Sequence, residues 1–183
     1  AVTRRFAAAG FVCLSPDLFH GKTYHTLEDC ALKKTSLDIP RAVDNIVDSV
    51  PYLRKLPWVG RKRVAVLGFC MGGGLALYAL AKSKVFGAGV IYYQSMFPDP
   101  ADLKTIRAPM LCHYGTDDPG TSQTEIDMFK SALDSYKKKY QIEMYPNAGH
   151  AFLNNPSAKS AANLEAAAKS VATTVKWLRK TLT

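Results

Sequence analysis

Short apolar runs alternate along the chain with longer segments in which apolar residues recur every three or four positions. The short runs, and one segment of alternating apolar and polar residues typical of an edge strand, predict strands over residues 11–14, 63–68, 85–93, 109–114 and 140–145. The longer segments predict helices over residues 3–9, 39–50, 72–82, 126–136 and 164–182. Because strands that alternate with helices pair in parallel, we expect one α/β domain over residues 1–183, with helices on both faces of a mostly parallel sheet.

Local features set the ends and faces of the predicted helices. Gly10 is placed to end the first helix, since glycine adopts the left-handed backbone of a helix C-terminus without strain. Pro51 is expected to kink or end the second helix, because it lacks an N–H and clashes with the preceding turn. Residues 20–38 are polar and predict a long loop. The last helix is expected to bury a stripe made of Leu164, Ala168, Val171, Val175, Leu178 and Leu182.

The turn Gly68-Phe69-Cys70-Met71-Gly72 lies between a predicted strand and a predicted helix. It has the form glycine–x–nucleophile–x–glycine, in which a strained turn pushes the central side chain out of the sheet. Glycine is expected at both ends because strand and helix approach too closely for a Cβ atom. The Cys70 sulfur is then at a helix N-terminus, which favours a thiolate, and the Met71 N–H points towards a developing oxyanion.

Two further loops follow predicted strands and carry an acid and a histidine. Asp117 and Asp118 stand in one loop, and His150 stands in the other. The carboxyl ends of parallel strands share one edge of a sheet, so we expect these residues to meet Cys70. In that arrangement His150 takes the proton of Cys70 and an aspartate orients the imidazole. The spacing G-x-x-D favours Asp118 for this role, with Asp117, otherwise a turn residue, as the alternative.

Other interpretations of the glycine-rich turn require residues that are absent from it. A Walker phosphate loop ends in Gly-Lys-Ser/Thr, but Leu75 follows Gly74 here. A dinucleotide-binding turn needs glycine at the position of Cys70. An inert buried thiol stays open as the alternative for Cys70.

The charge and the positions of the cysteines limit which binding partners and which cellular compartment we expect. The net charge is +9, but the Lys and Arg residues are scattered rather than gathered in a stripe, which argues against a nucleic-acid partner. No apolar run is long enough to span a membrane, so no membrane partner is expected. Cysteines stand at 13, 30, 70 and 112 without metal-ligand spacing, so no metal is expected. Cys13 and Cys112 lie in apolar runs, where reduced thiols are common, and this favours the cytoplasm.

These motifs resemble those of the dienelactone hydrolases (carboxymethylenebutenolidases), a family with the α/β-hydrolase fold. The resemblance runs from residues 9–19 through the Cys70 turn to Gly149-His150-Ala151-Phe152. The order nucleophile, acid, histidine is that of the α/β-hydrolase triad. The resemblance implies hydrolysis of a small ester or lactone through a thioester acyl-enzyme, with Cys70, Asp118 and His150 as the triad and no cofactor.

The resemblance also brings out differences. In the family, further strands precede the region that matches residues 2–19, and they carry a second oxyanion N–H and a glutamate that pairs with the cysteine; we expect this chain to lack those strands. The family member that opens dienelactones holds its substrate with two arginines, where this chain has Lys22 and Asn154. Both changes argue against a small dianionic lactone. Substrate contacts are expected from Lys22, Tyr93 and Phe152, with packing inside its loop as the alternative for Tyr93.

Two other functions stay open. One is a non-catalytic binding or scaffold protein that keeps the cysteine turn without a complete oxyanion hole. The other is a thiol acyltransferase or peptidase on the same fold. We expect a monomer or a homodimer, since an exposed sheet edge favours pairing between copies.

Overall fold

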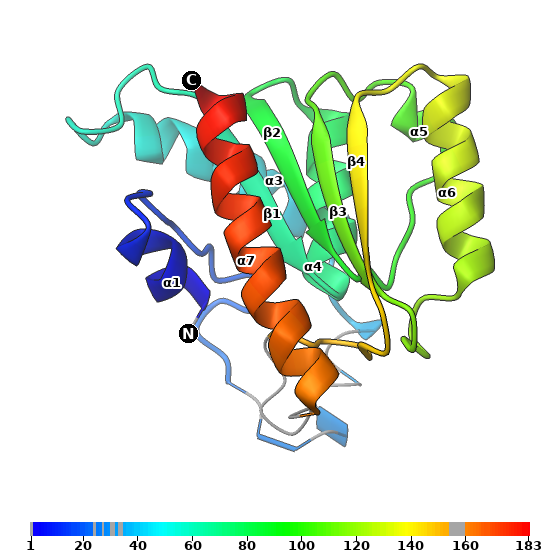
Figure 1. Ribbon diagram of the computed structural model, residues 1–183. Coiled ribbons are helices and arrows are strands. Elements are labelled where there is room, and N and C mark those ends of the chain that lie inside the picture. Colours follow the sequence, from blue (N-terminus) through cyan, green and yellow to red (C-terminus); the bar gives the residue numbers. More distant parts are fainter. Residues whose placement is uncertain (1, 24, 27, 30–31, 33–34, 154–159) are drawn as a thin grey trace.

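The computed structural model describes residues 2–23, 25–26, 28–29, 32, 35–153 and 160–183. Its centre is a parallel sheet of four strands in sequence order: β1 (Val64–Phe69), β2 (Phe86–Tyr92), β3 (Met110–Gly115) and β4 (Tyr140–Tyr145). The carboxyl ends of all four strands lie along the lower edge of the sheet in Figure 1. The predicted parallel sheet is confirmed, and β4 is an edge strand as its alternating pattern indicates.

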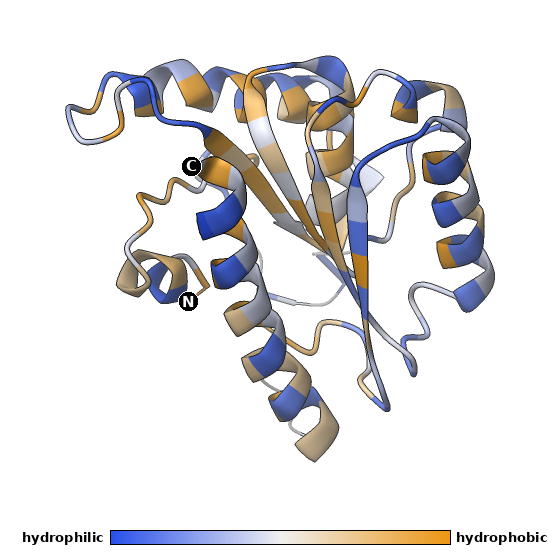
Figure 2. Cartoon of the chain, turned by 45° about the horizontal axis from the view of Figure 1, so that its top comes forward, coloured by the Kyte–Doolittle hydropathy of each residue, from blue (hydrophilic) through white to orange (hydrophobic). Residues whose placement is uncertain are grey.

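Helices cover both faces of this sheet (Figure 1). One face carries α3 (Ile39–Arg54), α4 (Met71–Lys82), the short α5 (Pro100–Leu103) and α6 (Gln123–Ser135). The other face is crossed by α7 (Ala161–Leu182), and α1 (Val2–Ala8) lies beside the end of α7. Hydrophobic positions dominate β1, β2 and β3, whereas β4 and the helices mix hydrophobic and hydrophilic positions (Figure 2). Among the helices that the structure describes, none is both long and apolar enough to cross a membrane.

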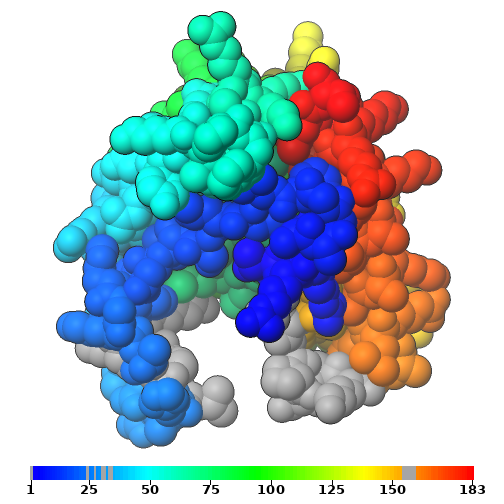
Figure 3. Space-filling model, turned by 90° about the vertical axis from the view of Figure 1, so that its left-hand side faces the viewer, coloured from blue at the N-terminus to red at the C-terminus, as the bar shows by residue number. Residues whose placement is uncertain are grey.

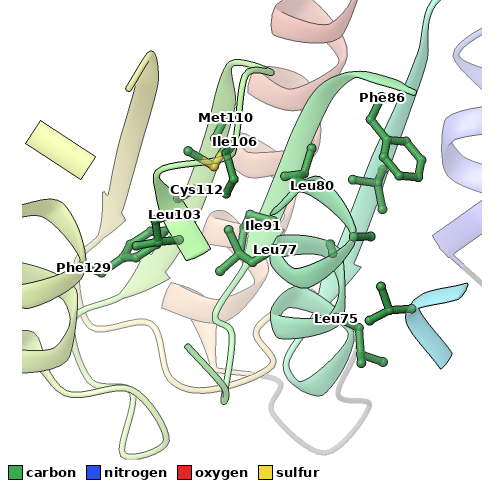
Figure 4. Packing of buried hydrophobic residues seen from close by; sticks show 14 of the residues in the cluster. Leu75, Leu77, Leu80, Phe86, Ile91, Leu103, Ile106, Met110, Cys112 and Phe129 are labelled. Atoms are coloured by element: carbon green, nitrogen blue, oxygen red, sulfur yellow. The ribbon is translucent and has the colours of Figure 1, made fainter. Parts of the chain in front are cut away.

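The main hydrophobic core lies between α4 and the sheet (Figure 4). Leu75, Leu77 and Leu80 of α4 are at most 3% exposed and belong to one cluster with Ile91 of β2 and Met110 of β3. Each buried leucine contributes about 1.5–3 kcal/mol to folding. This packing holds α4, and therefore the turn at its beginning, in a fixed position on the sheet.

The segment after α1 differs from the sequence prediction. Gly10 ends α1 with φ at 92°, as expected, but the predicted strand over residues 11–14 is wrong, because residues 11–17 have no regular structure. Part of this segment and β1 line one cavity of about 710 Å³, and in the sheet β1 pairs with β2. Figure 3 shows the segment in blue between the cyan end of α3 and the red end of α7. The predicted loop over 20–38 also contains helical backbone, at Glu28, Asp29, Leu32 and Thr35.

Two predicted helices need correction. Pro51 does not end α3, which continues to Arg54. In α7 the predicted stripe is wrong at its beginning, since Leu164 is 60% exposed and Ala168 is exposed as well, whereas Leu178 is buried as predicted. The buried positions of α7 are Asn163, Ala166, Ser170, Thr174 and Leu178. Polar residues can occupy this line because their side chains find hydrogen-bond partners inside the protein.

Candidate active site

The Cys70 turn joins β1 directly to α4. Cys70 has φ 52° and ψ −120°, a conformation that is strained for a residue with a Cβ atom. Hydrogen bonds hold this conformation: the Cys70 N–H donates to the Tyr92 carbonyl at 3.0 Å, and the Gly73 N–H donates to the Cys70 carbonyl at 2.9 Å. The half-buried Cys70 thiol therefore stands at the carboxyl edge of the sheet, at the N-terminus of α4.

Gly68 and Gly72, the two glycines of the turn, have different steric surroundings. A Cβ atom on Gly68 would lie 1.9 Å from the Gly72 carbonyl oxygen, so only glycine fits at 68. A Cβ atom on Gly72 would meet nothing within 4 Å, so the predicted steric need for glycine at 72 is wrong. The crowding falls further along α4, where a Cβ atom on Gly74 would lie 2.7 Å from the Met96 Cβ.

Asp118 and His150 stand on the loops that follow β3 and β4. His150 Nδ1 lies 3.0 Å and 2.9 Å from the two carboxylate oxygens of Asp118, and its N–H donates a hydrogen bond to that carboxylate. The Asp118 side chain is fully buried and also accepts the Gly120 N–H at 2.6 Å. The two loops can approach because Gly115 has no Cβ; one there would lie 2.0 Å from the Ala148 carbonyl oxygen.

Asp117 occupies the same turn but has partners other than the imidazole. It is exposed, and its carboxylate accepts a hydrogen bond from the Thr116 hydroxyl at 3.0 Å. Its own N–H donates to the Ala148 carbonyl at 3.0 Å and so ties the two loops together. Of the two aspartates, Asp118 is the one that holds His150.

Two hydrogen bonds, from Cys70 to His150 and from His150 to Asp118, favour a negative charge on the thiol group and a positive charge on the imidazole. The bond to His150 lowers the pKa of the Cys70 thiol from 9.0 to about 7; burial opposes this, and the Ser95 hydroxyl and the Met71 N–H add smaller effects in the same direction. The bond to Asp118 raises the pKa of His150 from 6.5 to about 9, and Cys70 adds to it. Between about pH 7 and 9 the pair is therefore mainly thiolate and imidazolium.

Comparison with known proteins shows the family of this chain. The model of the dienelactone hydrolase family matches residues 1–182. The chain belongs to the dienelactone hydrolase family. A Salmonella typhimurium protein named "Putative carboxymethylenebutenolidase" is 28% identical over 172 residues, which cover 82% of this chain and 61% of that protein. A Bradyrhizobium protein named "Probable 2-oxo-3-(5-oxofuran-2-ylidene)propanoate lactonase" is 30% identical over 158 residues, which cover 80% of this chain and 64% of that protein.

Solved structures support the fold of this dienelactone hydrolase family member. A dienelactone hydrolase-like promiscuous phosphotriesterase from metagenomic libraries has a TM-score of 0.82 at 21% identity, covering 98% of this chain and 79% of that one. The predicted α/β-hydrolase fold is confirmed. The chain spans 61% and 64% of the two curated relatives named above, which is less than two thirds of their length.

The predicted substrate contacts lie in two places. Lys22 lines a shallow depression of about 250 Å³ together with Arg41 and Asn45, and none of Cys70, Asp118 and His150 borders that depression. The structure therefore does not bring Lys22 together with the cysteine and its partners. Asn154 lies outside the described residues.

Tyr93 and Phe152 are next to His150 but are buried, at 0% and 3% exposed. Their rings pack edge to face with centroids 5.0 Å apart, and the Tyr93 ring lies 5.2 Å from the imidazole of His150. Both rings therefore support the histidine loop from inside the protein. This packing replaces the expected substrate contact, because a ligand cannot reach a ring that is fully covered.

Two of the other three cysteines, Cys13 and Cys112, lie in the described part of the chain. Cys13 and Cys112 carry free thiols, and burial raises the pKa of Cys112 to about 12. Within the described ranges, no three His, Cys, Asp or Glu side chains lie close enough together to hold a metal ion. Cys30 lies outside those ranges.

Ser95 also contacts Cys70, although no sequence pattern marks it as a site residue. Its Oγ lies 3.6 Å from the Cys70 sulfur, and its N–H donates to the Cys70 carbonyl at 3.3 Å. The available signal was its position just after β2, the strand that pairs with β1. A serine in a loop carries no pattern of its own, so this signal is visible only once the strand order is known.

Proposed function

We propose that this protein is a hydrolase that cleaves a small ester or lactone through an acyl-enzyme on Cys70. The observation that carries the proposal is the continuous contact from Cys70 through His150 to the buried carboxylate of Asp118, at the carboxyl edge of the sheet. Membership of the dienelactone hydrolase family supports a hydrolase. The names of the two relatives, a carboxymethylenebutenolidase and a lactonase, support an ester or lactone carbonyl as the point of attack.

In the first half of the proposed reaction, the Cys70 thiolate attacks the carbonyl carbon. The carbonyl electron pair moves onto oxygen, and the Met71 N–H donates to the resulting oxyanion. When the tetrahedral intermediate collapses, the C–O bond to the leaving group breaks. The departing alkoxide takes a proton from His150, and a thioester on Cys70 remains.

In the second half, water attacks the thioester while neutral His150 removes a proton from that water. The C–S bond breaks, the carboxylic acid leaves, and the thiolate–imidazolium pair is restored. Asp118 holds the imidazole in one tautomer and stabilises its charged form. Cys70, Asp118 and His150 follow strands of one sheet. We therefore propose that residues 1–183 act as a single domain.

The first prediction is that Cys70→Ala removes turnover of activated esters and lactones by about a thousandfold or more, since no other group supplies the nucleophile. Cys13→Ala is the matched control and is expected to keep full turnover, because Cys13 is a half-buried thiol in the segment after α1. Mass spectrometry after brief exposure to substrate is expected to find the acyl group on Cys70.

Two outcomes would contradict the proposal. Full turnover in Cys70→Ala would exclude the cysteine as the nucleophile. Acyl transfer to an added alcohol or amine in strong preference to water would show a transferase in place of a hydrolase.

A further inference from the structure

The chain segment that leaves β2, residues 92–96, is hydrogen-bonded to Cys70 at two positions; we call it the β2 exit segment. The Tyr92 carbonyl accepts the Cys70 N–H at 3.0 Å. Three residues further on, the Ser95 N–H donates to the Cys70 carbonyl at 3.3 Å. Ser95 is therefore held at a fixed position relative to the backbone of Cys70.

The β2 exit segment has little freedom to move. Gln94 is fully buried, and its carbonyl accepts the hydroxyl of Thr121, on the loop that carries Asp118, at 2.9 Å. The beginning of α4 presses against Met96 so closely that a Cβ atom on Gly74 would lie 2.7 Å from the Met96 Cβ. A side chain on this segment consequently keeps a defined distance to the sulfur of Cys70.

Ser95 is the residue of this segment whose hydroxyl reaches that sulfur, with Oγ 3.6 Å from Sγ. When Cys70 is a thiol, its S–H can donate to the serine oxygen. When Cys70 is a thiolate, the serine O–H can instead donate to the negatively charged sulfur, which gives the stronger of the two bonds. The contact therefore favours the ionised form of the cysteine.

We infer that Ser95 is a positioning residue that stabilises the Cys70 thiolate through a hydroxyl hydrogen bond and so sets how readily the nucleophile ionises. This inference rests on the proposed role of Cys70 as the nucleophile. The effect of Ser95 is smaller than that of His150, whose bond to Cys70 has the larger influence on the thiol. The two groups come from different strands, since Ser95 follows β2 and His150 follows β4.

Three other titratable groups surround the cysteine. His150 bonds to it directly, and the carboxylate of Asp118 stands behind that imidazole. The Tyr93 phenol also faces Cys70, but burial raises its pKa far above the neutral range, so it stays uncharged. A shift in the ionisation of Cys70 that appears on removal of the Ser95 hydroxyl is thus attributable to that hydroxyl, provided these three groups are unchanged.

The test is the rate of Cys70 alkylation by iodoacetamide against pH, measured by mass spectrometry of the Cys70 peptide. Unmodified protein is expected to show its inflection near pH 7. Ser95→Ala is expected to raise that inflection by roughly one pH unit, so that labelling at pH 6 falls about tenfold. Ser131→Ala, which removes an exposed hydroxyl on α6, is the control and is expected to leave the profile unchanged.

A pair of variants with equal shape keeps the test decisive if Ser95→Ala folds poorly. Ser95→Thr retains the hydroxyl and is expected to keep the inflection near that of the unmodified protein, whereas Ser95→Val is expected to raise it. Identical profiles for the threonine and valine variants would overturn the inference. Because alkylation needs no substrate, this result is independent of ester turnover: a protein without turnover would refute the proposed function and leave the Ser95 measurement valid.

Discussion

Two histidines on neighbouring strands of this protein have opposite surroundings. His113 lies within β3 and is fully buried, with Nδ1 2.9 Å from the Tyr145 hydroxyl and Nε2 2.9 Å from the Thr174 hydroxyl. His150 lies just beyond β4, is partly exposed, and is bonded to the carboxylate of Asp118. The first region offers neutral hydroxyl groups, and the second offers a negative charge.

This difference decides the chemistry of each ring. Burial lowers the pKa of His113 from 6.5 to about 3, so the ring is neutral at ordinary pH. The hydrogen bond to Asp118 raises the pKa of His150 to about 9, so that ring is the positively charged imidazolium at neutral pH. His113 also stacks on Tyr92, with centroids 4.3 Å apart, and serves the packing of the sheet against α7. Both residues are histidines, and they differ in burial and in the carboxylate beside His150. His113 is therefore a structural residue, whereas His150 is suited to proton transfer.

The sharpest contrast is expected from His150→Gln. Turnover should fall by about a thousandfold or more, because the proposed general base and acid is lost. The inflection of Cys70 alkylation should rise from about 7 towards the ordinary range of a thiol, because the largest cause of the lowered pKa is removed. Steady-state assays and alkylation profiles measure the two effects. A variant that keeps both the turnover and the inflection would place the proton transfer elsewhere.

The next effect tests the charge behind the ring. Asp118→Asn is expected to reduce turnover by roughly a hundredfold or more, since the amide keeps the volume but no longer stabilises the charged imidazole. Asp117→Asn is the matched control and should stay within about twofold of the unmodified protein, because its carboxylate bonds to Thr116 on the exposed side of the turn. Kinetics of both variants under one set of conditions decide between them. A larger loss in Asp117→Asn would reverse the assignment of the acid.

The smallest expected effect lies in the other region and concerns stability. His113→Leu removes two buried hydrogen bonds and is expected to lower the free energy of unfolding by about 1–3 kcal/mol at pH 7. Turnover should change only a few-fold, because the ring does not touch the proposed triad. Denaturant unfolding followed by an ester assay at native conditions measures both quantities.

The same variant should also alter how stability depends on pH. With a pKa near 3 in the folded state and 6.5 when unfolded, His113 binds a proton only in the unfolded chain between these values. It therefore lowers stability as pH falls from 6.5 towards 3, by up to about 1.4 kcal/mol per pH unit, and His113→Leu should remove that slope. Equal acid slopes in the two proteins would contradict the neutral assignment. Between 7 and 9 the raised pKa of His150 and the lowered pKa of Cys70 act in opposite directions and largely cancel.

The sequence by itself determined the four strands of the parallel sheet, together with a fifth over residues 11–14 that the structure does not form, and it determined the Cys70 turn and the three loops that meet at one sheet edge. These features follow from local patterns: short apolar runs, helical periodicity, and glycine at a position where a Cβ has no room, as at Gly68. The preference for Asp118 over Asp117 also came from local spacing, and Asp118 is the aspartate that bonds to His150 in the structure.

Only the tertiary structure decided which partners each side chain meets. The apolar run over 11–14 has no regular structure and lines one cavity together with β1. In α7, Thr174 is buried with hydrogen bonds to Tyr92 and His113, and the Ser170 hydroxyl donates to the Ala167 carbonyl. Ser95 reaches the Cys70 sulfur because β2 lies beside β1. Hydrogen bonds and burial between distant segments depend on distances that no local pattern encodes, and these distances give His113 and His150 their different chemistry.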